Sequence, residues 1–283
     1  MNTTSLPTLY LSHGSPMLAL EPREAGAFLK RLGPVIDATF GRPKAILALS
    51  AHTLTRSPVL LAAEHHEAVY DFGGFPPELY TLRYATAGAP ELATRVQTLL
   101  ASRGIEVQRT SNGGLDHGIW TPLRYMYPAA DIPVLPLAWV PSWSPAQLHA
   151  FGAALAPLAD EGVLIIGSGS ITHNLSLVFA NRSGNPQAVD APETPETAAF
   201  RAWVQSRASA GDVAALFDYR KSAPHAVLMH PSDEHWLPWY PAQGAGGAQG
   251  LRLHESLTFG TLAMDSYAFG PQAPRLAAAL QVQ

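Results

Sequence analysis

The histidines are the residues of this chain best placed to do chemistry. The 283 residues include eleven histidines and no cysteine, so a metal site here would need imidazole or carboxylate ligands. Three histidines follow short apolar runs that we expect to be strands: His13 after residues 9–12, His52 after 45–50 and His173 after 163–167. Ligands of α/β sheets bind beyond the carboxyl ends of the strands. Because imidazole binds iron, zinc, copper and nickel, these positions predict a metal site.

Two further segments carry side chains that could join this site. His117 directly follows Asp116, whose carboxylate could fix the imidazole tautomer or raise its basicity. Farther along, Glu234, His235 and Trp236 occur in succession. Neighbouring side chains on a strand or a helix point in very different directions, so only one of Glu234 and His235 is expected to contact a metal. The sequence alone does not decide whether Glu234 or His235 is the metal ligand.

Other candidates have simpler interpretations. His65 and His66 stand beside two glutamates and predict a solvated loop. Residues 167–170 read Gly-Ser-Gly-Ser, but Thr172 occupies the place of the third glycine of a dinucleotide-binding loop. The same residues do not form a serine nucleophile turn, because Gly169 stands where the serine would be. Aromatic residues that could wall a pocket for a planar substrate are Phe72, Phe75, Tyr80, Tyr125, Tyr127, Trp236 and Trp239.

Composition excludes several classes of protein. The chain is 47% hydrophobic and 14% charged, which is typical of a folded protein with a large core, so a metal would serve chemistry and not folding. The formal charge is −4 and no cluster of Lys or Arg is present, which argues against a nucleic-acid partner. No apolar run approaches the roughly 20 residues that cross a bilayer. The first residues lack a secretory pattern, so we expect a cytoplasmic protein.

The elements that must position these residues alternate between strands and helices. Predicted strands cover residues 9–12, 45–50, 59–63, 134–137, 163–167 and 251–254. Predicted helices cover residues 90–102, 145–158 after an N-cap at Ser144, and 195–208. Residues 181–194 and 242–250 predict surface loops. This alternation predicts a single catalytic domain over residues 1–283, with an αβα architecture around a mostly parallel or mixed central sheet.

Several short motifs, in order along the chain, closely resemble the 4,5-DOPA extradiol dioxygenase family, which belongs to the class III extradiol ring-cleavage enzymes. They are His-Gly-Ser-Pro at 13–16, Ser-Ala-His at 50–52, Phe-Pro-Pro-Glu-Leu-Tyr at 75–80, Asp-His-Gly at 116–118, Gly-Ser-Gly-Ser at 167–170, Thr-His-Asn-Leu at 172–175 and Glu-His-Trp-Leu-Pro at 234–238. Together they span most of the chain. Thr53 departs from the aromatic residue expected there, which bears on substrate fit.

The resemblance implies the chemistry of the site. It implies cleavage of a small catechol by dioxygen at a mononuclear non-haem Fe(II) ion, with zinc also found in purified members of the family. His13, His52 and His235 would be metal ligands, with Glu234 as the alternative to His235. His173 would be the acid–base residue or a fourth ligand. His117 would act in catalysis and, together with Trp236, in substrate binding.

Two other functions use the same residues. A zinc hydrolase would activate water at the histidines and would turn over without dioxygen. A non-catalytic metal-binding protein would take up metal without turning over any catechol.

Overall fold

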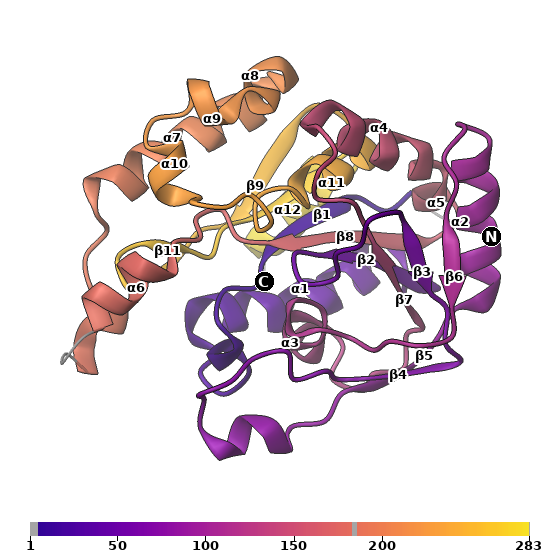
Figure 1. Cartoon of the computed structure of the whole chain (residues 1–283), viewed down its shortest axis with the longest axis horizontal. Helices are drawn as coiled ribbons and strands as arrows, with labels where there is room; N and C mark the ends of the chain where they lie inside the picture. Colours follow the sequence, from indigo (N-terminus) through magenta and orange to yellow (C-terminus); the bar gives the residue numbers. More distant parts are fainter. Residues whose placement is uncertain (1–4, 183–185, 283) are drawn as a thin grey trace.

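A mixed sheet of eight strands forms the centre of the molecule in a computed structural model that describes residues 5–182 and 186–282 (Figure 1). The strand order is β6-β3-β7-β2-β8-β1-β12-β9. The strands are β1 (Thr8–Ser12), β2 (Ala45–Ser50), β3 (Val59–Leu61), β6 (Gln108–Thr110), β7 (Val134–Ala138), β8 (Val163–Gly169), β9 (Gly250–His254) and β12 (Ser266–Phe269). Strands β1, β8, β2 and β7 are parallel, whereas β12 pairs antiparallel with both β1 and β9. The predicted αβα fold with a mixed sheet is thus confirmed.

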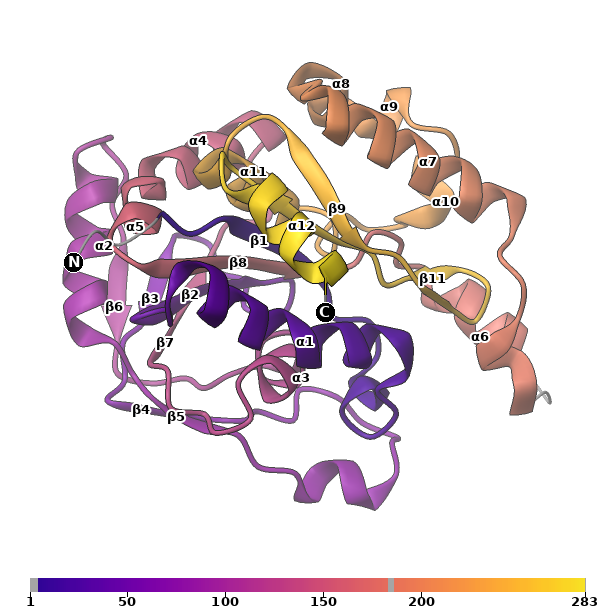
Figure 2. The ribbon, with the colours of Figure 1, turned by 180° about the vertical axis from the view of Figure 1, so that it is seen from behind.

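Helices cover both faces of the sheet. Helices α1 (Arg23–Phe40), α3 (His117–Met126) and α12 (Ala273–Val282) pack on one face, and Figure 2 shows α1 and α12 on the near side of the sheet. Helices α2 (Pro90–Ala101), α4 (Pro145–Leu155), α5 (Pro157–Asp160) and α11 (Trp239–Gly246) cover the other. None of the described helices combines the length and the apolar character that crossing a bilayer requires.

The remaining elements lie around this three-layer centre. Helices α7 (Pro195–Ala210), α8 (Val213–Phe217), α9 (Tyr219–Ser222) and α10 (Ala226–Met229) gather beside β9 (Figure 1). Two short ribbons pair β4 (His65–Glu67) with β5 (Ala85–Ala87) and β10 (Leu257–Thr258) with β11 (Leu262–Ala263). The last helical segments are α6 (Leu175–Arg182), η1 (Pro16–Ala19), η2 (Pro77–Thr81) and η3 (Pro186–Asp190).

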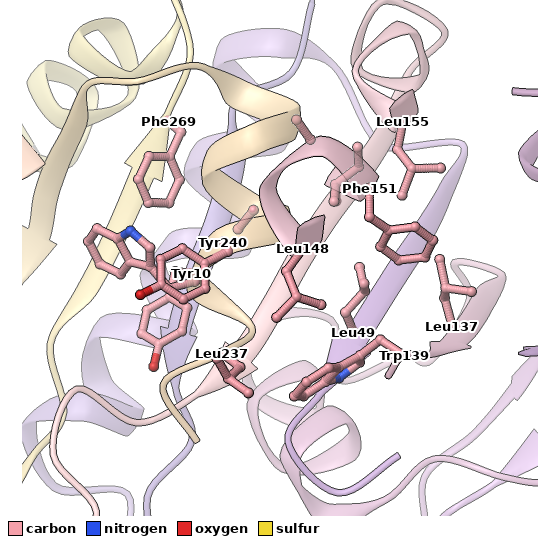
Figure 3. Close-up of a cluster of buried hydrophobic side chains, with 14 of the residues drawn as sticks. Tyr10, Leu49, Leu137, Trp139, Leu148, Phe151, Leu155, Leu237, Tyr240 and Phe269 are labelled. Carbon is pink, nitrogen blue, oxygen red and sulfur yellow. The ribbon is translucent and has the colours of Figure 1, made fainter. Parts of the chain in front are cut away.

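The core is divided by the sheet into two hydrophobic clusters. Strand side chains alternate between the faces, so Tyr10 belongs to one cluster and its neighbour Leu9 to the other. Figure 3 shows Leu148 and Phe151 of α4 packed over Leu49 of β2. Burial of both faces explains why the central strands are apolar throughout.

Helix α11 corrects the prediction of a loop over residues 242–246, and β9 begins at Gly250, so only residues 247–249 are irregular as predicted. The small residues of α11 let the helix approach α4 closely. A Cβ on Gly244 would lie 2.0 Å from the carbonyl oxygen of His149, and one on Gly152 would lie 2.1 Å from that of Pro241. The composition that resembled a loop therefore reflects tight helix packing.

Three other predictions differ from the structure in detail. The helix expected over residues 145–158 ends at Leu155, and α5 begins at Pro157, whose ring and missing N–H prevent continuation. Ser144 is the N-cap as predicted, and with Gln147 it forms a capping box. His66 is fully buried, not solvated, because the alternation of β4 turns it inward between two exposed neighbours. The predicted loop at 181–194 contains the end of α6 and η3, and its residues 183–185 lie outside the described part of the chain.

Candidate metal centre

The register of the parallel strands places His13 and His52 at one edge of the sheet. Strand β8 lies between β1 and β2, and its end is level with both, because Ser12 pairs with Gly169 and Ser50 with Ser168. The backbone N–H of His13 donates to the Gly169 carbonyl at 2.9 Å. The two imidazoles then meet across the end of β8, with 3.1 Å between their Nε2 atoms.

His235 reaches the same point from a loop before α11. Its backbone carbonyl accepts hydrogen bonds from the Tyr10 hydroxyl at 2.8 Å and from the Ser170 N–H at 2.9 Å. A Cβ on Gly169 would lie 2.0 Å from this carbonyl oxygen, so glycine is required for the loop to approach β8. The Nε2 atom of His235 lies 3.2 Å from that of His52.

The hydrogen bonds of the Nδ1 atoms fix the tautomers of His13 and His235. The Ser168 hydroxyl donates to the Gly118 carbonyl at 2.5 Å, so it accepts from Nδ1–H of His13 at 2.9 Å. The Glu234 carboxylate, which can only accept, lies 3.1 Å from Nδ1 of His235. Both histidines therefore carry their proton on Nδ1 and direct an Nε2 lone pair toward the centre.

Asp71 is a functional residue that the sequence analysis missed. Its carboxylate accepts from Nδ1 of His117 at 2.9 Å and from the His117 backbone N–H at 3.1 Å. The other oxygen of Asp71 lies 3.5 Å from Nδ1 of His52. The carboxylate thus orients the imidazole of His117 and lies next to that of His52. No local pattern marks Asp71, since it lies in a loop 46 residues before His117 in the sequence.

Asp116 does not have the role expected from its position. Its carboxylate accepts from the Ser50 hydroxyl at 2.7 Å, the Thr53 hydroxyl at 2.5 Å and the Gly118 N–H at 2.8 Å. As the N-cap of α3 its side chain faces backbone, so the His117 tautomer is held by Asp71 instead. Thr53, which departs from the family motif, anchors this buried carboxylate.

The three converging imidazoles fit a metal cation. Burial lowers the pKa of His13 well below its usual value, lowers that of His52 to about 3, and lowers that of His235. The rings are therefore neutral at pH 7, and the Nε2 lone pairs of His13 and His235 both point toward Nε2 of His52. A cation between the three nitrogens could bind all of them. Nitrogens bound about 2.1 Å from one tetrahedral ion would be about 3.4 Å apart, close to the distances found here.

Two groups of side chains surround this centre. Ligand atoms of His13, His52 and His117 lie within 4.8 Å of one another, and so do those of His173, Glu234 and His235. The Nε2 distances of 3.1 and 3.2 Å single out His13, His52 and His235 across these groups. Glu234 is instead engaged by its hydrogen bond to His235, which also holds the pKa of Glu234 down at about 2.

His173 lies beside the converging imidazoles, but its ring is held by stacking and not by hydrogen bonds. Its ring stacks on His235 with 3.4 Å between centroids, and its backbone N–H donates to the Met229 carbonyl at 2.9 Å. Among the described residues, no hydrogen bond fixes either of its ring nitrogens. Burial lowers the pKa of His173 to about 2, so the ring is neutral at pH 7.

The site opens into a cavity of about 1030 Å³. His52, His117, His173 and His235 line it, together with the aromatic rings of Phe72 and Phe75. The expectation that Trp236 contacts a substrate is wrong in this structure. Trp236 is fully buried, stacks on Trp239 and donates its indole N–H to the Tyr240 hydroxyl, because its loop turns this side chain into the core.

Comparison with known proteins finds similarity to aromatic ring-opening dioxygenases. Residues 7–270 match the family described as the catalytic LigB subunit of aromatic ring-opening dioxygenase. The chain is 40% identical over 266 residues to 4,5-DOPA dioxygenase extradiol of Beta vulgaris, covering 93% of this chain and 96% of that protein. It is 34% identical to the protein of the same name in Escherichia coli strain K12, covering 95% and 97%. A crystal structure of an uncharacterised Escherichia coli K12 protein matches with a TM-score of 0.75 and 32% identity, covering 94% of this chain and all of that one.

Proposed function

Because the chain belongs to the family of the catalytic LigB subunit of aromatic ring-opening dioxygenases, and is thus an extradiol ring-cleavage dioxygenase, we propose that it cleaves a small catechol with dioxygen at a mononuclear Fe(II) centre held by His13, His52 and His235. The observation that carries the assignment of these ligands is the convergence of their Nε2 atoms at 3.1 and 3.2 Å. The Nδ1 partners of His13 and His235, which are Ser168 and Glu234, support it, because metal-bound histidines donate their other N–H in this way.

The side chains that line the cavity have different proposed roles in proton transfer and substrate binding. An Fe(II) ion held by His13, His52 and His235 would supply the redox chemistry that ring cleavage by dioxygen requires, whereas zinc would not, because it has no redox chemistry. His173 takes a phenolic proton on a ring nitrogen and returns it later, since that ring is neutral and free of hydrogen bonds among the described residues. His117, held by Asp71, faces the cavity and binds the substrate or dioxygen.

Two aromatic rings, Phe72 and Phe75, line the cavity beside His117. Phe72 packs edge-on against His117, with 5.6 Å between the centroids, and Phe75 packs against Phe72. An aromatic wall of this kind suits a planar catechol ring. It also lowers the local dielectric constant, which strengthens the interactions of the charged catechol with the site.

The test is dioxygen uptake after anaerobic loading with Fe(II), with a panel of catechols that includes L-DOPA. We expect uptake and a yellow semialdehyde product with Fe(II) and neither with zinc. His52→Ala should lose stoichiometric metal binding and uptake together, whereas His65→Ala, an exposed histidine outside the cavity, should keep both. Full metal content and full uptake in His52→Ala would refute the ligand assignment. Turnover of a substrate without dioxygen would favour a zinc hydrolase instead.

A further inference from the structure

Helix α6 presents exposed apolar side chains to the cavity at the histidines. Leu175 is 49% exposed and Phe179 is 59% exposed, and both line the cavity together with Val178. Their spacing of three and four residues puts these side chains on one face of the helix. Large apolar side chains that stay exposed where they line a cavity are typical of a binding site for an apolar group.

The β10–β11 ribbon and its turn add to this apolar lining. Leu257, Phe259 and Leu262 line the same cavity, and both α6 and β10 contact η3. The Phe259 N–H donates to the Val189 carbonyl of η3 at 3.0 Å, which holds the ribbon in place. Among the described residues that line the cavity, none from α6 or the ribbon is charged. We call the following residues the apolar wall: Leu175, Val178, Phe179, Leu257, Phe259 and Leu262.

The apolar wall begins beside the proposed acid–base residue. His173 and Leu175 are two residues apart, so their Cα atoms lie within about 7 Å of each other. Phe179 is one helical turn beyond Leu175, a rise of about 6 Å. The Asn174 side chain donates to the Leu228 carbonyl at 2.7 Å and so fixes the start of α6. A ring bound at the histidines is therefore within reach of the wall.

The cavity also has more room than a bare catechol ring requires. Its volume of about 1030 Å³ is at the upper end of the roughly 300–1000 Å³ that is typical of pockets for drug-sized ligands. A substrate that fills it carries a substituent on the ring. A substituent that extends along α6 contacts the apolar wall.

We propose that the apolar wall is the subsite for an apolar substituent of the catechol, with Leu175 and Phe179 as specificity-determining residues. The preferred substrate is a catechol whose ring carries an alkyl or aryl group. That group covers the two exposed side chains when the ring lies at the histidines, and removal of apolar surface from water favours its binding. This inference rests on the proposed function, because it takes the ring to lie at the histidines.

Binding to the zinc-loaded protein tests the proposal without turnover. Titration calorimetry would compare 4-methylcatechol, 4-butylcatechol and 4-hexylcatechol. We expect the affinity to rise about twofold to fourfold for each added CH₂ group, the range from partial to complete burial. A second comparison uses 4-propylcatechol and 4-(2-hydroxyethyl)catechol, which differ only in a terminal methyl or hydroxyl group. The propyl compound should bind about tenfold more tightly, because a hydroxyl against an apolar wall loses hydrogen bonds to water.

Two variants locate the substituent along α6. Phe179→Ala should weaken 4-hexylcatechol binding about fivefold to tenfold and leave 4-methylcatechol within about twofold. Leu175→Ala, nearer to His173, should weaken both 4-butylcatechol and 4-hexylcatechol. The matched control is Val227→Ala, because Val227 on α10 is 58% exposed and lies outside the cavity. This control should change none of these affinities.

The outcomes distinguish the inference from the proposed function. If 4-methylcatechol binds but the affinity does not rise with chain length, the inference alone is wrong. Equal weakening of 4-methylcatechol and 4-hexylcatechol in Phe179→Ala would also overturn it, because Phe179 would then affect the whole site. A dimer in sedimentation velocity that Phe179→Ala dissociates would overturn it too, since a second copy would then cover α6. If the unaltered protein binds none of the catechols, the proposed catechol function fails as well.

Discussion

The Asp71 carboxylate contacts two histidines of the proposed site. It accepts a hydrogen bond from Nδ1 of His117, the proposed substrate-binding ring, and lies 3.5 Å from Nδ1 of His52, a proposed ligand. Groups that orient metal ligands in this way typically change metal affinity 10- to 100-fold when mutated. The contribution of Asp71 to metal affinity can therefore be measured separately from that of the ligands.

We predict that Asp71→Asn weakens zinc binding by about 10- to 100-fold, because an amide offers one acceptor where the carboxylate offers two. Competition with a chelator would measure the affinity. Asp131→Asn is the control, since Asp131 pairs with Arg42 at the surface. Unchanged affinity in Asp71→Asn would mean that the bonds from Asp71 do not orient the ligands.

A substitution of His173 can show whether this residue acts as an acid–base group or as a metal ligand. We predict that His173→Ala retains one metal ion per chain and loses about 10²- to 10⁴-fold in the rate of ring cleavage, the usual contribution of a positioned acid or base. Metal analysis and dioxygen uptake on the same sample would test both parts. Loss of the metal together with the activity would instead identify His173 as a fourth ligand.

At the scale of elements, close packing of α4 against α11 holds the loop of His235 in place. Helix α11 begins at Trp239, four residues after His235, and the Gly152 contact lies at this junction of helices. The small residues at the contact are therefore part of the support for the site as well as of the core.

We predict that Gly152→Ala destabilises the protein by about 1–3 kcal/mol through overpacking. The added Cβ would lie 2.1 Å from a backbone oxygen, which cannot rotate away as a side chain can. Alanine usually stabilises a helix relative to glycine by about 0.5–1 kcal/mol, so the clash outweighs that gain. Urea unfolding would measure the difference, with Gly73→Ala as control because no atom lies within 4 Å of its added Cβ. Equal stability of Gly152→Ala and the parent would show that α11 can shift.

At the scale of the whole molecule, both hydrophobic clusters depend on the same sheet. Because each central strand contributes to both faces, neither cluster can persist once the sheet is lost. We therefore propose that residues 1–283 unfold as one domain. Calorimetry should show a single transition whose calorimetric and van't Hoff enthalpies agree. Two resolved transitions would contradict a single domain.

A buried ion pair ties the C-terminal strands to α7. Asp265 has no exposed side-chain surface and accepts from Arg201 at 2.7 Å, while Arg252 lies 3.4 Å away. Without Asp265, Arg201 keeps its partner Glu193 and Arg252 keeps Glu255, each at 2.6 Å, so the loss is that of the buried charge-assisted hydrogen bonds. We predict that Asp265→Ala costs about 1.5–3 kcal/mol in urea unfolding. Asp218→Ala, which breaks an exposed pair with Lys221, should cost much less, and a similar cost for both would argue against this account.

The sequence by itself predicted the family and most of the central sheet. Apolar runs predicted six of its eight strands, because strands buried on both faces are rich in apolar residues. Strands β6 and β12 were missed, since the first is short and polar and the second begins with Ser266. The ordered motifs predicted the family, and His13 and His52 were expected at strand ends because parallel strands carry ligands there. These features depend on residues close together in the sequence.

Only the tertiary structure decided the contacts between distant segments. It showed that the side chain of His235 faces the other histidines, whereas Glu234 binds the back of the His235 ring. The sequence could not decide this, because the side chains of adjacent residues diverge. It turned Trp236 into the core and buried α11, whose glycines resembled a loop until their close neighbours were known. It brought Asp71 to His117 and Arg23 to Asp190, across 46 and 167 residues. Such pairs leave no local pattern, because a hydrogen bond or ion pair depends on distance in space and not on separation along the chain.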